Sequence, residues 1–232
     1  MNARPSVLLL PGMLCDEAVW QHQIATLSPY VDLQVPVFRG FSSFAAMADH
    51  VLALAPARFS LVSHSMGGRV AMELLRRNPE RIEHFVIMDA GVHPVAVGEY
   101  ERNRQLLALA ASGGLAAVAE QWIPFMLHPR RHADAALCER IRLMVLRNSV
   151  EDLRGQLEAA LQRPDQTAYL ASIHHTVRIV CGEQDNWNPL PLQRQLKAAL
   201  AAAELVVIPD CGHMAPMEAP ERVSQLLLDW LV

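Results

Sequence analysis

Three residues with the side chains of a nucleophile, an acid and a base follow apolar runs in this sequence. Ser65 lies in the stretch LVSHSMGGRV, where an apolar run stops and a helical pattern starts. Asp185 lies in GEQDNWNP and His213 in CGHMAP, and each comes just after a later apolar run. A serine hydroxyl becomes a strong nucleophile when a base takes its proton, and an acid can orient a histidine base. The three residue types therefore indicate nucleophilic chemistry if the fold brings them together.

The composition limits the class of protein. The chain has 232 residues, 52% of them hydrophobic and 19% charged, which is enough apolar material for a sizeable core. The formal net charge of −4 provides no basic face, so we expect no nucleic-acid partner. The apolar run at 7–10 is too short for a signal peptide, and no stretch reaches about 18 apolar residues. We therefore expect no membrane partner and a cytoplasmic location, while the oligomeric state stays open.

The sequence indicates neither a metal site nor a cofactor site. Its four cysteines form no CxxC pair and no metal-finger spacing, which favours reduced thiols. His128 and His132 have i, i+4 spacing, but the glutamate of an HExxH motif is missing and Pro129 interrupts a helix there. The stretch FRGFSS holds a single glycine and therefore no phosphate-binding loop. We expect no metal ion and no cofactor.

Six short apolar runs predict a β-sheet. They are nearly continuous, as in strands of a parallel sheet that are buried on both faces. Their ranges are 6–10, 33–38, 59–63, 84–89, 177–182 and 204–209. Helical patterns alternate with them at 16–28, 43–55, 66–78, 189–203 and 220–231. This alternation indicates the α/β class, with right-handed βαβ units building a mostly parallel, twisted sheet of about six strands and helices on both faces.

A long helical stretch interrupts this rhythm. Residues 93–167 contain several helical patterns and no convincing strand. We predict that residues 1–92 and 168–232 form the α/β core and that 93–167 form a helical cap inserted after the fourth strand. Trp122, Phe125 and Met126 in this stretch would line a substrate site or belong to the core of the cap, and the sequence does not rank the two.

The order of the reactive residues matches a known family. Ligands of open α/β sheets bind at the carboxyl ends of the strands, and the order Ser65, Asp185, His213 is that of the α/β-hydrolase nucleophile elbow and its partners. The chain resembles the α/β-hydrolase superfamily over essentially its whole length, and within it small bacterial serine esterase-type hydrolases. The resemblance rests on LLLPGMLCDEAVWQHQ, HSMGG and CGHMAPMEAPERV. Ser63 replaces the first glycine of the usual G-x-S-x-G, and Pro11 stands where many relatives have histidine, but neither change removes a catalytic group.

The resemblance implies a role for each reactive residue. Ser65 would be the nucleophile and His213 the general base. Asp185 would hold the imidazole tautomer and stabilise the imidazolium, since it follows the fifth strand as the usual acid of the family does. Asp89, at the end of the fourth strand, is the rival acid because some relatives use that position.

The resemblance also implies an oxyanion hole and a substrate class. The backbone N–H groups of Met13 and Met66 would stabilise the developing oxyanion, and their thioethers would shape an apolar acyl pocket. We expect a small apolar acyl substrate and hydrolysis of a carboxylic ester, a thioester or a lactone. The same triad would also support C–C bond hydrolysis, cyanohydrin cleavage or perhydrolysis, and a non-catalytic ligand receptor is a third possibility. A haloalkane dehalogenase is disfavoured because its nucleophile would be an aspartate at the position of Ser65.

Overall fold

The computed structural model describes residues 4–232, and its six strands form one parallel sheet. The order across the sheet is β2-β1-β3-β4-β5-β6, and every neighbouring pair is parallel. The strands are β1 (Ser6–Leu10), β2 (Asp32–Gln34), β3 (Phe59–His64), β4 (Ile82–Met88), β5 (Val177–Gly182) and β6 (Ala203–Ile208). The predicted six-stranded parallel sheet is confirmed. Residues 1–3 of the predicted core lie outside the described residues.

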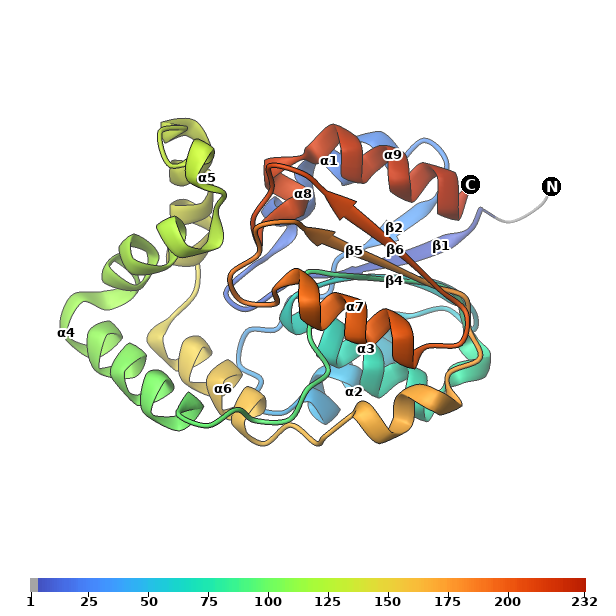
Figure 1. Cartoon of the computed structure of the whole chain (residues 1–232), viewed down its shortest axis with the longest axis horizontal. Coiled ribbons are helices and arrows are strands. Elements are labelled where there is room, and N and C mark those ends of the chain that lie inside the picture. Colours follow the sequence, from blue (N-terminus) through green and yellow to red (C-terminus); the bar gives the residue numbers. More distant parts are fainter. Residues whose placement is uncertain (1–3) are drawn as a thin grey trace.

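Helices cover both faces of the sheet (Figure 1). One face carries α1 (Gln21–Leu27), α8 (Ala215–Glu218) and α9 (Pro220–Leu231), and the other carries α2 (Phe44–Leu54), α3 (Met66–Arg77) and α7 (Leu190–Ala199). Successive strand side chains point to opposite faces. In β1, therefore, Val7 and Leu9 pack into the core beside α1 and α9, whereas Leu8 and Leu10 pack into the core beside α2 and α3. Short 3-10 helices complete the connections at Glu17–Trp20, Pro79–Arg81, Pro129–Arg131 and Thr167–Ser172.

The second strand is shorter than the predicted range 33–38. β2 ends at Gln34, two residues before Pro36, and it lies at the edge of the sheet beside β1. Proline has no N–H group to donate to the strand ladder. The apolar residues after Pro36 therefore continue as a connection toward α2 and not as a strand.

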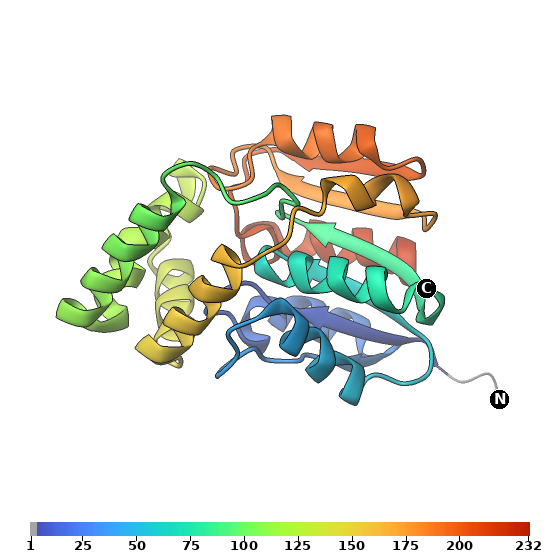
Figure 2. The same cartoon turned by 90° about the horizontal axis from the view of Figure 1, so that it is seen from below.

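Three helices follow β4 and cover one end of the sheet. They are α4 (Glu99–Met126), α5 (Ala135–Leu146) and α6 (Val150–Leu161). Figures 1 and 2 show them at the end toward which the strand arrows point, opposite the two chain termini. We call α4, α5 and α6 the helical segment. Because parallel strands bring their carboxyl ends to that same edge, the helical segment lies where ligands of α/β sheets bind.

Helix α4 is long and apolar enough, by length and composition, to cross a membrane. It has 28 residues, and the mean hydropathy of its most apolar 18-residue window is 1.4. However, Gly114 has a φ of 66° and a ψ of −172°, which breaks the helix, and Pro124 lies in its second half. The two parts, 99–113 and 115–126, are each shorter than the roughly 20 residues that a spanning helix needs. We therefore treat α4 as a kinked helix of the helical segment.

Candidate active site

Ser65 lies at a strained turn between β3 and α3. Its φ of 52° and ψ of −117° are a combination that residues with side chains rarely adopt. The backbone packs tightly at this turn, since a Cβ on Gly67 would lie 2.4 Å from the carbonyl oxygen of Leu10. Ser63 fits this crowded site because its hydroxyl donates a hydrogen bond to the carbonyl oxygen of Val86 at 3.0 Å. The substitution of glycine by Ser63 therefore leaves the turn intact.

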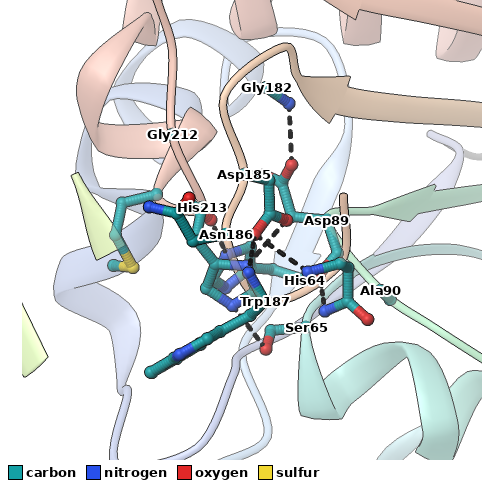
Figure 3. A network of polar contacts seen from close by, with 12 residues as sticks. His64, Ser65, Asp89, Ala90, Gly182, Asp185, Asn186, Trp187, Gly212 and His213 are labelled. Carbon is teal, nitrogen blue, oxygen red and sulfur yellow. Dashed lines mark hydrogen bonds and ion pairs between the residues drawn. The ribbon is translucent and has the colours of Figure 1, made fainter. Parts of the chain in front are cut away.

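A chain of hydrogen bonds joins Ser65, His213 and Asp185 (Figure 3). Nε2 of His213 lies 2.8 Å from Oγ of Ser65, and its Nδ1 lies 2.9 Å from Oδ2 of Asp185. The three side chains come from the carboxyl ends of β3, β5 and β6. His213 is 1% exposed and Asp185 is 2% exposed, whereas Ser65 borders a cavity. The geometry is that of a nucleophile, a base and an orienting acid.

The surroundings of Asp185 favour its ionised form. Burial opposes the charge, but the charge and hydrogen bond of His213 and two backbone N–H donors hold the pKa of Asp185 below its ordinary value. The N–H groups of Trp187 and Asn188 donate to Oδ1 at 2.7 and 3.0 Å. Oδ2 is thereby left to accept the Nδ1–H of His213, and Nε2 is left to accept a proton from Ser65.

Asp89, the rival acid, lies in the same buried region but does not bond to the His213 ring (Figure 3). Its Oδ1 accepts a hydrogen bond from the N–H of Gly182 at 2.8 Å, and Oδ2 has no hydrogen-bond partner among the described residues. Burial, followed by the charge of Asp185, raises the pKa of Asp89 well above its ordinary value. Because Asp185 and not Asp89 bonds to the imidazole, the geometry favours Asp185 as the acid.

His64 supports the site in a way that sequence reasoning missed. Its Nε2 donates to the carbonyl oxygen of His213 at 2.8 Å, and the two rings lie 5.2 Å apart. Burial, followed by the charge of His213, lowers the pKa of His64 to about 3. The ring is therefore neutral, and it holds the backbone of His213 without adding charge. The sequence offered one indication of this role, which is the position of His64 directly before Ser65.

The two predicted oxyanion donors, Met13 and Met66, line the same cavity as Ser65. Met66 begins α3, where the N–H groups of the first turn have no intrahelical acceptor. Met13 precedes Leu14, whose φ of 54° shapes the loop after β1. The side chain of Gln156 in α6 accepts a hydrogen bond from the N–H of Leu14 at 2.8 Å. The helical segment thus fixes the loop that carries Met13, a contact that the sequence did not reveal.

A cavity of about 760 Å³ lies over Ser65, and aromatic residues cover part of its wall. Trp122 and Phe125 line it, which is one of the two positions that the sequence left open for them. Trp187 joins them, with its ring 5.2 Å from that of Trp122 and 4.6 Å from that of His213. Met126, the third candidate for a substrate contact, is a correction, because it does not line the cavity. Its side chain is 5% exposed within the core and does not line the cavity, because the chain turns there so that its carbonyl accepts the His213 N–H at 2.7 Å.

The cavity wall also carries charged and titratable side chains, which differs from the expected apolar acyl pocket. Arg69, His93, Glu99 and Arg163 all line it. Arg163 donates to the two carboxylate oxygens of Glu99 at 2.6 and 2.8 Å. Sequence reasoning missed Arg69, although it stands four residues after Ser65, in the first turn of the helix that Ser65 caps.

Residues 4–232 contain no metal-binding cluster, and three of their four cysteines are buried. Within residues 4–232, no group of three His, Cys, Asp or Glu side chains is placed to hold a metal ion. The four cysteines are free. Burial raises the pKa of Cys15 and of Cys181 to about 12 and raises that of Cys211 as well, so these thiols stay protonated and unreactive.

Several known proteins with similar sequences or structures are hydrolases. An Escherichia coli (strain K12 / DH10B) 2-hydroxy-6-oxononadienedioate/2-hydroxy-6-oxononatrienedioate hydrolase is 28% identical over 183 residues, which are 75% of this chain. The aligned region spans 62% of the length of that relative. A thermophilic esterase from Thermogutta terrifontis, solved with malate bound, matches with a TM-score of 0.91 and 28% identity over 100% of this chain and 90% of its own.

A second solved structure supports the same fold. The enol-lactonase from Burkholderia xenovorans LB400 has a TM-score of 0.89 and 20% identity, with coverage of 98% of this chain and 91% of its own. The model of the alpha/beta hydrolase family matches residues 7–226, which is nearly the whole chain. With the sheet order, the turn at Ser65 and this match in agreement, the chain belongs to the alpha/beta hydrolase family.

Proposed function

We propose that this chain is a serine hydrolase that cleaves a small carboxylic ester, thioester or lactone through an acyl-enzyme. The observation that carries the proposal is the hydrogen-bonded chain from Ser65 through His213 to Asp185, with Ser65 on the wall of the cavity. The surroundings of Asp185 and His213 support the proposed roles of these two residues. The pKa of Asp185 is lowered, which keeps the acid ionised, and the neutral ring of His64 anchors His213.

The proposed reaction has two half-reactions. In the first, Oγ of Ser65 bonds to the substrate carbonyl carbon while Nε2 of His213 takes its proton. The oxyanion is stabilised by the N–H groups of Met13 and Met66, and its collapse breaks the bond to the alcohol, which leaves with the proton from His213. In the second, water attacks the acyl-enzyme, gives its proton to His213 and releases the acid, and the proton returns to Ser65.

The relatives favour one second candidate, which is hydrolysis of a C–C bond. The substrate named for the Escherichia coli relative is a hydroxy-oxo dienedioate, which has no ester linkage, so its hydrolysis breaks a carbon–carbon bond beside the keto group. The Thermogutta esterase, equally similar in sequence, is named for ester chemistry. We place ester hydrolysis first because the mechanism above requires no group beyond those near Ser65.

A fluorophosphonate probe tests the proposal. It should label the wild-type chain at Ser65, because such probes react with a serine that has a base and an oxyanion hole. The matched control is Ser63→Ala, which removes a neighbouring hydroxyl bonded to Val86 and should leave the labelling in place. Labelling that persists in Ser65→Ala would refute the proposal. A panel of ethyl esters, thioesters, lactones and a 2-hydroxy-6-oxo-dienoate would then separate the two candidates by kcat/KM.

A further inference from the structure

Arg69 is a buried cation on the cavity wall without an anionic partner. It lies on α3, is 7% exposed and lines the same cavity as Ser65. Among the described residues, no carboxylate lies within 4 Å of its guanidinium, and its Nη1 atom has no hydrogen-bond partner. Buried charges in proteins are normally paired and hydrogen-bonded. An unpaired guanidinium beside a reactive serine therefore indicates that its partner is a ligand.

The acidic groups near Arg69 are already engaged. Both carboxylate oxygens of Glu99 bond to Arg163, and the Asp165 carboxylate lies off the cavity wall and bonds to the neighbouring Thr167. The wall thus carries Arg69, Arg163 and the exposed Arg102 against the single carboxylate of Glu99. Even so, the Arg69 guanidinium stays protonated at neutral pH, since burial and the charge of Arg163 lower its pKa only to about 9. The cavity therefore has an excess of positive charge.

The position of Arg69 relative to Ser65 suits a small substrate. Ser65 caps the N-terminus of α3, Arg69 is the fourth residue of that helix, and both residues line the same cavity. A substrate whose carbonyl carbon is at Ser65 can therefore reach the guanidinium with a group a few bonds away. Of the groups a small acyl compound can carry, a carboxylate matches the planar pair of N–H donors of a guanidinium best.

We propose that Arg69 binds a carboxylate on the acyl part of the substrate, so that the chain acts on short dicarboxylic acid derivatives in preference to neutral acyl compounds. This inference rests on the proposed hydrolase function of Ser65. The carboxylate would supply the missing charge beside Arg69, while the reacting carbonyl lies between Ser65 and the oxyanion donors. Trp122 and Phe125 would contact the apolar part of the substrate on the same wall.

Monoethyl esters of dicarboxylic acids with four to seven carbons test the proposal, each compared with the ester whose free carboxylate is replaced by a carboxamide. The wild type should favour the best acid over its amide by about 30-fold or more in kcat/KM, as expected for a buried charge pair. Arg69→Met should reduce this ratio to near one. Arg104→Met is the matched control, because Arg104 is an exposed arginine of α4 that pairs with Glu101 away from the cavity, and the ratio should not change.

A binding measurement keeps the test independent of turnover. Adipate should raise the melting temperature of the wild type and of Arg104→Met but not that of Arg69→Met. Without adipate, Arg69→Met should melt no lower than the wild type, because the charge it removes has no partner. A structural role for Arg69 predicts the opposite, namely a lower melting temperature and equal losses on both esters.

Several outcomes would overturn the inference. They are equal use of acids and amides by the wild type, a preference that survives in Arg69→Met, or no adipate shift in the wild type. Failure of the proposed function itself has a different signature, which is hydrolysis of neither ester together with no fluorophosphonate labelling of Ser65. In that case an Arg69-dependent adipate shift would still support the carboxylate site.

Discussion

Replacing either buried acid by its amide separates the two candidates for the acid of the triad. In Asp185→Asn, the amide oxygen would still accept the N–H groups of Trp187 and Asn188 that now bond to Oδ1. The amide nitrogen would then face Nδ1 of His213, where Oδ2 now lies at 2.9 Å. Because an amide N–H is a donor, Nδ1 would have to accept, and the ring proton would move to Nε2. Nε2 would then be unable to take the proton of Ser65.

The expected loss is large because His213 in the wrong tautomer cannot act as the general base and so cannot later act as the general acid. A change of this kind in a serine triad costs about 10⁴-fold in kcat. At 1.36 kcal/mol for each factor of ten, this corresponds to about 5.4 kcal/mol of transition-state stabilisation. Asp89→Asn should change kcat by no more than about threefold, because Asp89 does not bond to the His213 ring and the amide oxygen can still accept the Gly182 N–H.

The assay is steady-state hydrolysis of the best ester found for the wild type, with circular dichroism and thermal melting to show that both variants fold. Active-site titration with a fluorophosphonate would correct kcat for inactive protein. A large loss in Asp89→Asn with near-normal activity in Asp185→Asn would refute the reasoning. The acid would then belong to β4, and the bond between Asp185 and His213 would have only a structural role.

Two further predictions concern the surroundings of the triad. Gln156→Met removes the acceptor for the Leu14 N–H and should lower kcat about tenfold, less than the loss of a whole oxyanion donor, with a smaller effect on KM in initial-rate measurements. Asp89 affects stability in a pH-dependent way, since an acid whose pKa is raised by folding destabilises the protein as pH rises above the unfolded value of 3.8. Urea unfolding should therefore show Asp89→Asn gaining stability over the wild type as the pH rises above about 4, and a constant difference would contradict this.

The sequence was most informative where chemistry and local structure share the same residues. Ser65 could be located because a strand pattern, a serine and two glycines with a helical pattern after them follow one another in LVSHSMGGRV. Asp185 and His213 could be grouped with it because the ends of parallel strands meet at one edge of a sheet. The topology of a parallel sheet thus predicted that these three residues lie close together, although the sequence contains no distances. This topological rule alone did not decide between Asp185 and Asp89, which lie at neighbouring strand ends, although only Asp185 bonds to the imidazole.

Contacts made by the tertiary fold were not accessible in this way. The bond between Gln156 and Leu14 joins residues 142 positions apart, and no pattern near either residue indicates it. Whether Arg69 has an anionic partner depends on where Glu99 and Arg163 lie in the fold. The sequence did not indicate a missing partner, since an arginine on a helix is usually paired or solvated. The sequence left open whether Met126 lines the cavity or belongs to the core, and the structure places it in the core although it is next to Phe125 in sequence.

The helical segment is part of the catalytic scaffold as well as a cover for the cavity. Three side chains, one from α6 and two from the connection between α5 and α6, hold the loop after β1. Arg147 donates to both carboxylate oxygens of Asp16 at 2.7 and 2.8 Å, Asn148 donates to the Leu14 carbonyl at 2.9 Å, and Gln156 accepts the Leu14 N–H. Lifting these residues would therefore release the loop that carries Met13, one of the two proposed oxyanion donors. Substitutions along this contact should accordingly change kcat, whereas changes of the aromatic wall in α4 should act mainly on substrate choice.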